Sequence, residues 1–271
     1  MSPIWLYEIP LWVLGTLVIG TTLLYTIGGL FLARRWVEAT PSGNESAGAM
    51  LSIAGVAYAV LLAMIAVEAW NGVAAVEASI QAEANALSGI YRNVEPYRAA
   101  ERDHIRGVVR DYIDFVIRDE WPALRRGSRS PRTELAGQQL NNELTTFDAL
   151  SDAEQMVQPL VLEQAAAFTE ARQLRLLLGT RGLSAVTWVV VVLGGMITMG
   201  FAFFFRTDAF GTHVVMSCFA GAMLGILIFL IVAMDHPLWG DFSVRPDAFR
   251  EALQVFEHMH ISADTSAARA P

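Results

Sequence analysis

Few residues of this 271-residue chain are spaced in a way that suggests chemistry. Glu101 and His104 stand three residues apart, which on a helix places a carboxylate and an imidazole on one face, as in carboxylate-bridged metal sites. Such a site needs a second copy of the pair, and the sequence has none. His258 and His260 form a lone pair near the C-terminus, which is too few ligands for a metal. We therefore predict no metal site and no cofactor.

Asp235 and His236 are adjacent at the end of a long apolar run, and they resemble an acid–imidazole catalytic pair. A charged rim at a membrane border explains them more simply. The sequence has no phosphate-binding loop, dinucleotide fingerprint or nucleophile elbow. The one cysteine, Cys218, lies in an apolar run and has no second cysteine to pair with in the chain. We expect no enzymatic activity.

The composition indicates a membrane protein. Hydrophobic residues make up 54% and charged residues 17% of the chain, whereas about 25% of a soluble domain is charged. Asp, Glu, Lys and Arg are absent from four long stretches, at Ile9–Ala33, Ala49–Val67, Leu183–Phe205 and Phe210–Met234. About 20 residues at 1.5 Å per residue cross the roughly 30 Å hydrocarbon core. The sequence therefore predicts four transmembrane helices in contact with the lipid bilayer.

The first stretch is predicted to be a retained span. It has no basic residue before it and is followed by Arg34 and Arg35, whereas a cleaved signal peptide begins basic and ends at small residues. The net charge of −8 argues against a nucleic-acid partner, which needs a basic surface.

Residues 71–182 are predicted to form a helical bundle that extends spans two and three. Their first apolar stripe has helical spacing and consists of Val73, Val76, Ile80, Ala84, Leu87, Tyr91 and Val94. Only Asn71-Gly72 separates it from the second span, so we expect one helix from about 49 to 94. Pro96 ends this helix.

Three further helices complete the predicted antiparallel bundle. The second carries Ile105 to Val116 and closes at Trp121-Pro122, and the third runs from Leu135 to Phe147. Ser151 and Glu154 form a capping box that opens the fourth, in which Pro159 marks a kink or a later start. An arginine-rich loop at 125–132 is predicted to be solvated.

The chain is thus predicted to be all-α. Its parts are a first transmembrane hairpin at 1–70 (spans about 9–33 and 49–70), the soluble bundle at 71–182, a second hairpin at 183–234, and a C-terminal segment at 235–271. That segment is expected to contain an exit turn, a short amphipathic helix and a disordered tail.

Two sets of span residues are candidates for function. The absence of mid-membrane charges argues against a proton-coupled transporter, but hydrophobic constrictions can gate a channel. The pore-lining candidates are Tyr58, Leu62, Ile65 and Glu68, which fall near one face of the second span. The helix-packing candidates are Gly55, Ala59, Ala63, Gly221 and Gly225. These small residues suit close packing within one subunit or between subunits.

Loop charges leave the orientation in the membrane ambiguous. Arg34, Arg35 and Arg206 favour termini and a large domain outside the cell. The opposite is favoured by Arg172, Arg175, Arg181, Arg245 and Arg250. The short-loop arginines lead us to expect the outside arrangement, in a multi-pass protein of the bacterial inner membrane.

Several short motifs give the chain a family likeness. It reads Gly-Val-Ala-Tyr-Ala-Val-Leu-Leu-Ala at 55–63, Glu-Ala-Asn-Ala-Leu-Ser-Gly-Ile-Tyr-Arg at 83–92, Asp-Tyr at 111–112, Glu-Trp-Pro at 120–122, Ala-Arg-Gln-Leu-Arg at 171–175 and Asp-x-Pro-x-x-Gly at 235–240. Over roughly residues 5–257 it resembles the bacterial bestrophin-like domain family of unknown function.

The resemblance implies a homo-oligomer that conducts ions. Bestrophins are pentameric anion channels in which the second membrane helix lines a pore with a hydrophobic neck, and their large domain is cytosolic. This chain has an Ala-, Val- and Leu-rich second span in place of a Phe-rich neck, and no acidic calcium-clasp run. Two hypotheses follow: an oligomeric ion channel, more specifically for anions, and a non-conducting membrane sensor or scaffold that acts through its helical bundle.

Overall fold

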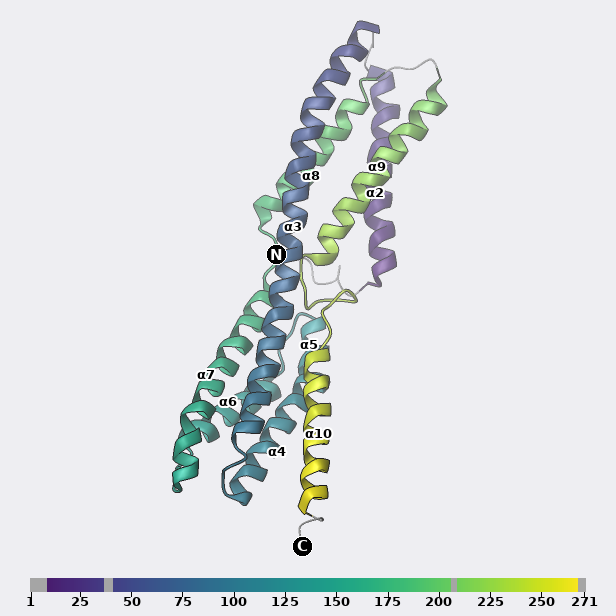
Figure 1. The fold of residues 1–271 in the computed structure, drawn as a ribbon. Coiled ribbons are helices and arrows are strands. Elements are labelled where there is room, and N and C mark those ends of the chain that lie inside the picture. The colour runs from purple at the N-terminus through teal and green to yellow at the C-terminus, as the bar shows by residue number, and fades with distance from the viewer. Residues whose placement is uncertain (1–8, 37–40, 206–208, 268–271) are drawn as a thin grey trace. The chain divides into compact units, whose positions relative to one another are not determined.

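The computed structural model describes residues 9–36, 41–205 and 209–267, apart from the side chains of 36, 41–43 and 260–267. The described residues form helices and contain no strand. In chain order the elements are α2 (Leu11–Trp36), α3 (Pro41–Asn93), α4 (Ala99–Phe115), the π-helical segment η1 (Val116–Glu120), α5 (Trp121–Arg125), α6 (Pro131–Thr146), α7 (Asp152–Thr180), α8 (Ala185–Ala202), α9 (Phe210–Met234) and α10 (Asp247–Ala267) (Figure 1).

The chain divides into two compact units. The membrane unit contains the residues up to Gly72, Arg181–His236 and Gly240–Phe242. The helical unit contains Val73–Thr180, Pro237–Trp239 and the residues from Ser243 onward. The single 53-residue helix α3 supplies residues to both units.

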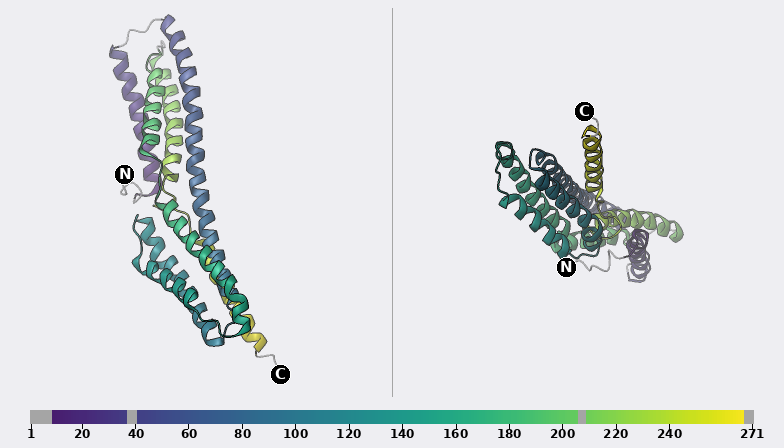
Figure 2. Two further views of the ribbon diagram at one scale, coloured as in Figure 1. Left: turned by 90° about the vertical axis from the view of Figure 1, so that its left-hand side faces the viewer. Right: turned by 90° about the horizontal axis from the view of Figure 1, so that it is seen from below.

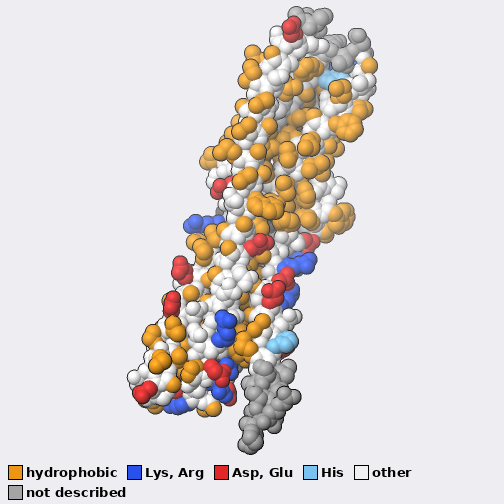
Figure 3. Space-filling view, in the orientation of Figure 1, with side chains coloured by type: hydrophobic (Ala, Val, Ile, Leu, Met, Phe, Trp, Pro, Cys, Tyr) orange, Lys and Arg blue, Asp and Glu red, His pale blue; other side chains and the backbone are white. Residues whose placement is uncertain are grey.

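The membrane unit is built from α2, the first part of α3, α8 and α9, which run beside one another (Figure 2). Four helices of the described chain are long and apolar enough to cross a membrane, which confirms the predicted helical membrane protein. Figure 3 shows a face of this unit covered by hydrophobic side chains. Large apolar residues at the surface suit contact with lipid.

Small residues allow the membrane helices to approach closely. A Cβ atom at Gly15 of α2 would lie 3.4 Å from the Phe229 ring of α9, and one at Gly221 of α9 would lie 2.6 Å from Thr26 Oγ1 of α2. A smaller cluster packs Leu62 of α3 against Val191 of α8 and Ile231 of α9. Packing of this kind, rather than a hydrophobic driving force, holds helices together in lipid.

The helical unit combines the second part of α3 with α4, α6, α7 and α10 around one apolar core. Fully buried core residues include Leu87, Ile113, Leu140, Val161 and Phe256. The α10 helix joins the bundle through Phe256, whose ring stacks on Tyr91 with the centroids 4.0 Å apart. The predicted bundle helices are therefore present, and α10 packs beside them.

Local hydrogen bonds explain where the bundle helices begin. Ser151 Oγ accepts from the Glu154 N–H, and Glu154 Oε2 accepts from the Ser151 N–H, which confirms the predicted capping box. Ser130 Oγ likewise accepts from the Thr133 N–H at the start of α6. The α7 helix continues through Pro159.

Two elements differ from the prediction. The second bundle helix does not close at Trp121-Pro122, because η1 connects α4 to α5 and Pro122 falls in the first turn of α5, where proline needs no N–H partner. The C-terminal helix is long rather than short: α10 runs to Ala267. Most of the segment expected to be disordered is therefore helical, and residues 268–271 lie outside the described residues.

Candidate functional site

The helical unit contains a buried network of charged side chains. Arg175 of α7 donates from Nε to Glu83 Oε2 of α3 at 2.7 Å, and from Nη2 to Glu120 Oε2 of η1 at 2.7 Å. The side chains of Arg175 and Glu83 have no exposed surface, and that of Glu120 is 1% exposed. These charge-assisted bonds join three elements that are far apart in sequence.

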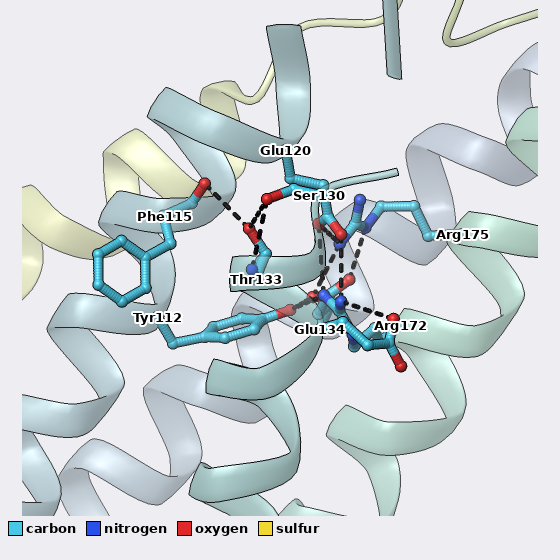
Figure 4. Close-up of polar contacts among 9 residues, drawn as sticks. Tyr112, Phe115, Glu120, Ser130, Thr133, Glu134, Arg172 and Arg175 are labelled. Atoms are coloured by element: carbon cyan, nitrogen blue, oxygen red, sulfur yellow. Dashed lines mark hydrogen bonds and ion pairs between the residues drawn. The ribbon is translucent and has the colours of Figure 1, made fainter. Parts of the chain in front are cut away.

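Arg172 and Tyr112 extend the network (Figure 4). Arg172 Nη2 donates to Glu120 Oε1 at 3.1 Å, and its Nη1 donates to the Tyr112 hydroxyl. The same hydroxyl donates to Glu83 Oε1. Glu134 of α6 adds an outer carboxylate, 3.6 Å from Arg172 Nη2. The network therefore pairs two guanidinium groups with two deeply buried carboxylates, so the fully buried charge sums to zero.

The sequence explains how these groups meet. Arg172 and Arg175 are three residues apart, so they share the face of α7 that also buries Phe168 and Leu176. Glu83 lies on the buried stripe of α3 between Ile80 and Leu87. In η1 the Trp121 N–H donates to the Val116 carbonyl, five residues earlier. That wider turn places Glu120 in the core.

The charges in the network are held strongly. Burial alone would raise the pKa of Glu120, but Arg175 and Arg172 hold it below its usual value. Burial would lower the pKa of Arg175, but Glu83 and Glu120 raise it well above the usual value. Burial, together with Glu83, raises the pKa of Tyr112 well above 10.0. Glu120, Arg172 and Arg175 therefore stay charged and Tyr112 stays protonated at neutral pH.

This arrangement suits the positioning of helices. The carboxylates accept hydrogen bonds from guanidinium groups. The Tyr112 hydroxyl donates to Glu83 and accepts from Arg172. Arg175 Nη1 has no hydrogen-bond partner among the described residues; the guanidinium lies 5.3 Å from the Trp121 ring and 5.7 Å from the Phe249 ring. The network ties α3 and α7 to η1.

The structure places the predicted pore-lining residues in different environments. The Tyr58 hydroxyl donates to the Val191 carbonyl of α8 at 2.7 Å. Leu62 is 3% exposed, and Ile65 packs against the same small core. Glu68 is exposed. That these four residues line a pore stays a prediction. Tyr58, Leu62 and Ile65 pack inside the protomer, which argues against a pore-lining role for these three.

The opposite face of α3 is uncovered. In the membrane unit it presents large apolar side chains that fall on one side of the helix, three, four and seven residues apart, namely Ile53, Val56, Val60 and Val67, each between 58% and 71% exposed. Further along α3 the same face presents small neutral residues, all exposed, namely Asn71, Ala74, Ala78 and Asn85. We call these eight residues the α3 open face.

The predicted packing residues divide into two groups. Gly221 and Gly225 of α9 lie against α2, where a Cβ at Gly225 would lie 2.5 Å from Thr22 Oγ1 and 3.0 Å from the Ile19 Cα. A Cβ at Gly55 would meet nothing within 4 Å, and Ala59 and Ala63 are exposed. The α9 glycines therefore pack within the protomer, whereas the small residues of α3 stay open.

The other residues considered from sequence have local partners. His104 Nε2 lies 3.0 Å from Glu143 Oε2 of α6. Asp235 accepts from the Leu183 N–H through Oδ1 at 2.6 Å and pairs with His236 Nδ1 through Oδ2 at 3.0 Å. No group of three or more His, Cys, Asp or Glu within the described residues is arranged to hold a metal ion.

The remaining histidine pair is only partly described. The Nδ1 atom of His258 lies 2.7 Å from the Gln254 carbonyl oxygen. The side chain of His260 lies outside the described residues.

Comparisons with known proteins give a consistent family and fold. The model of the Bestrophin-like domain family matches residues 20–249. The fold is similar to two variants of a bacterial Bestrophin homolog from Klebsiella pneumoniae. One is 12% identical with a TM-score of 0.64, covering 89% of this chain and 98% of that chain. The other is 14% identical with a TM-score of 0.62, covering 88% and 99%.

A crystal structure described as that of a membrane protein with a proline-to-alanine substitution is also similar, at 13% identity and a TM-score of 0.63, over 89% of this chain and 97% of that chain. No curated protein matches the chain. Identities this low bear on the fold alone.

The sequence motifs contain the five deeply buried members of the network but do not reveal that they meet, and they do not include Glu134. Glu83, Tyr112 and Glu120 each stand in a motif that carries the family resemblance, and 171–175 contains both arginines. The missed signal is that Glu83 interrupts an apolar stripe at a buried position. A buried carboxylate requires a buried partner.

Proposed function

Because the chain belongs to the Bestrophin-like domain family, we propose that it forms an oligomeric ion channel in the membrane, with a conduit lined by the α3 open face. The observation that carries the proposal is what α3 exposes on that face in each unit. Ile53, Val56, Val60 and Val67 are exposed in the membrane unit, where Asn71 follows them, and Ala74, Ala78 and Asn85 of the same helix are exposed in the helical unit.

The two parts of the open face suit different parts of a conduit. Apolar side chains around a narrow pore act as a gate by excluding water. The alanine and asparagine residues that follow leave width for a hydrated ion and carry no charge to trap it. Lipid alone would account for the apolar part of the face, but lipid contact gives no reason for the small neutral part in a water-exposed helix.

The first experiment measures assembly and conduction together. We expect purified protein in detergent to form a symmetric ring, visible by native mass spectrometry and cryo-electron microscopy. We expect the same preparation in liposomes to pass ions. A monomer or dimer without a central opening would instead support the non-conducting sensor or scaffold.

A matched pair of variants tests the lining. Val60 on the open face is 58% exposed, and Val189 on α8 is 60% exposed. Val60→Thr adds a hydroxyl with little change of shape and should raise the flux, because it wets the constriction. Val189→Thr should leave the flux unchanged. Equal fluxes from the two variants would contradict a lining by α3.

The sign of the ion is the finer part of the proposal. The family resemblance implies anions, but three of the four exposed charges among the described side chains of α3 are carboxylates, Glu45, Glu68 and Glu77, and the fourth is Arg92 near its C-terminal end. Rings of carboxylates favour cations. We expect these residues to weaken anion preference, so Glu68→Gln should shift the reversal potential in asymmetric salt toward that of the anion. A reversal potential that shifts toward that of the cation, or does not shift, would show that Glu68 does not face the conduit.

A further inference from the structure

The segment that joins α5 to α6 concentrates positive charge at the surface of the helical unit. Residues 121–133 contain four arginines and no acidic residue. These arginines are Arg125, Arg126, Arg129 and Arg132, and all four are exposed. We call residues 125–132 the arginine-rich segment. Exposed arginines this close in sequence indicate a surface that attracts a partner of negative charge.

Backbone hydrogen bonds hold the arginine-rich segment in a defined turn. The N–H groups of Arg126 and Ser128 each donate to the Ala123 carbonyl at 3.0 Å, and the Gly127 N–H donates to the Leu124 carbonyl at 2.8 Å. Gly127 has a φ of 67°, a conformation that glycine adopts without steric cost. The arginines are therefore presented by a turn of fixed geometry.

One side of the arginine-rich segment lies near the end of α7. Arg129 lines the same cavity as Leu177, and Leu177 is three residues before Thr180, where α7 ends. The helical unit also ends at Thr180 in this part of the chain, and the span α8 begins five residues later, at Ala185. Arg129 therefore lies close to the point from which the chain continues into a membrane span.

The start of α5 lies near a second such point. Trp121 Nε1 donates to the Val244 carbonyl at 2.8 Å. Val244 is the second residue after the chain returns from Phe242 of the membrane unit. Arg245 follows it and is also exposed. Residues beside both ends of the arginine-rich segment thus adjoin the membrane unit along the chain.

Positive charge remains after the nearby carboxylates are counted. Asp119 lies 3.2 Å from Arg132, and Glu134 lines the cavity beside Arg129. Surface ion pairs of this kind are weak, so they leave these arginines available to a phosphate. Two further arginines are exposed and form no ion pair within the described part of the chain, Arg126 and Arg245.

We propose that the arginine-rich segment and Arg245 bind the headgroups of anionic phospholipids in the bilayer that the membrane unit spans. The planar guanidinium groups donate paired hydrogen bonds to phosphate oxygens. Basic residues beside a span add affinity for anionic lipid, and the attraction fades within a Debye length, about 10 Å at 0.1 M salt. The proposal does not depend on whether the protein conducts ions.

Lipid binding is measured by native mass spectrometry of the full-length protein in detergent. The probes are phosphatidylglycerol, phosphatidylcholine with the same acyl chains, and glycerol phosphate as the soluble headgroup. We expect phosphatidylglycerol to bind most tightly, and its advantage to shrink as the salt concentration rises, because salt screens exposed charges. Equal affinity for phosphatidylglycerol and phosphatidylcholine would overturn the proposal.

Single variants locate the lipid. Arg126→Gln and Arg129→Gln should each weaken phosphatidylglycerol binding about fivefold, the effect of one basic residue near a membrane surface, and leave phosphatidylcholine binding unchanged. Arg92→Gln is the matched control, because Arg92 is exposed near the far end of α3. At 1.5 Å per residue, Arg92 lies about 28 Å along the helix from Val73, where the helical unit begins.

Three outcomes of these measurements would overturn the assignment. Equal losses in Arg92→Gln and Arg126→Gln would mean that net charge, rather than this segment, attracts the lipid. Glycerol phosphate that binds as tightly as phosphatidylglycerol would make the segment a site for soluble anions. A smaller oligomer in Arg126→Gln, with phosphatidylglycerol affinity unchanged, would make the segment a contact between copies of the chain. A preparation that binds the lipid but never conducts would count against the proposed function alone.

Discussion

The two units of this chain differ in how their helices bury polar groups. Within the spans of the membrane unit, hydroxyls bond to backbone carbonyls, as Thr26 does to Thr22 and Tyr58 does to Val191, and the buried Asp235–His236 pair lies after the last span. The close contacts there involve glycine against a neighbouring helix. In the helical unit, the core instead encloses paired charges on Glu83, Glu120 and Arg175.

This difference follows from what each unit packs against. Lipid offers the membrane helices no hydrophobic gain from association, so shape and short hydrogen bonds decide their contacts. The helical unit has an apolar core of its own. A charged network inside that core adds little net stability, but it is costly to break, because each group depends on its partner. The membrane unit should therefore be sensitive to volume, and the helical unit to charge.

The largest effect is expected from Arg175→Met. It leaves Glu83 and Glu120 buried without their shared guanidinium, and removing one partner of a buried ion pair costs about 3–5 kcal/mol of unfolding free energy. The measurement is denaturant unfolding of the purified protein, followed by tryptophan fluorescence. Arg118→Met is the control, since that side chain is 74% exposed and pairs with Asp114 at the surface. Equal losses in both variants would contradict a charge-dependent core.

A smaller effect, of about 1–3 kcal/mol from overpacking, is expected from Gly225→Ala in the membrane unit. The new Cβ would lie 2.5 Å from Thr22 Oγ1 and 3.0 Å from the Ile19 backbone. Gly20→Ala is the matched control, because a Cβ there meets nothing within 4 Å. Thiol labelling of Cys218 during thermal unfolding reports on this unit. If Gly225→Ala and Gly20→Ala unfold at the same temperature, the space available to side chains does not decide the packing of the membrane unit.

A pH-dependent effect is expected from Glu154 at the start of α7. Backbone N–H groups of Ser151, Arg98 and Leu150 donate to its carboxylate and lower its pKa from 4.5 to about 2. Because the folded-state pKa is the lower one, this stabilisation is present above pH 4.5 and is lost as the pH falls toward 2. Unfolding measured across that range should decline less steeply in Glu154→Gln than in the wild type. Parallel curves would mean that the cap does not depend on charge.

The smallest effect is expected from Tyr58→Phe, which removes one hydroxyl bonded to the Val191 carbonyl. Hydrogen bonds between membrane helices contribute about 0.6 kcal/mol on average. Tyr25→Phe, which removes a bond to the Met196 carbonyl, should cost a similar amount in the same thermal assay. If either tyrosine variant lost more stability than Gly225→Ala, hydrogen bonding would matter more than packing volume in the membrane unit.

The sequence allowed most of the helices to be predicted, because their signals are local. Charge-free runs indicated the spans, and Ser151 with Glu154 indicated the start of α7. The π-helical turn could not be predicted, since nothing in Val116–Glu120 distinguishes it from an ordinary helical turn. The pairing of Glu83 with Arg175 depends on tertiary contact between distant helices.

The face of α3 that packs inside the protomer was also hard to foresee. A helix of the second span that is apolar all round gives no periodicity from which to choose one face. Tyr58 and Leu62 are four residues apart, and so are Val56 and Val60, so both pairs have helical spacing. The first pair packs inside the protomer, whereas the second pair lies on the opposite face and is exposed. The choice depends on Gly194 and Gly195 of α8, which leave room for the Tyr58 ring.

The π-helical turn makes the core sensitive to chain length as well as to residue type. Each residue of an α-helix turns the chain by about 100°, and a π turn accommodates one extra residue without breaking the helix. Deleting a single residue between Val116 and Glu120 would restore regular winding and leave α5 close to its present orientation, but it would change which residue of η1 faces the core. The position of the Glu120 carboxylate beside Arg172 and Arg175 should therefore depend on the number of residues in this turn.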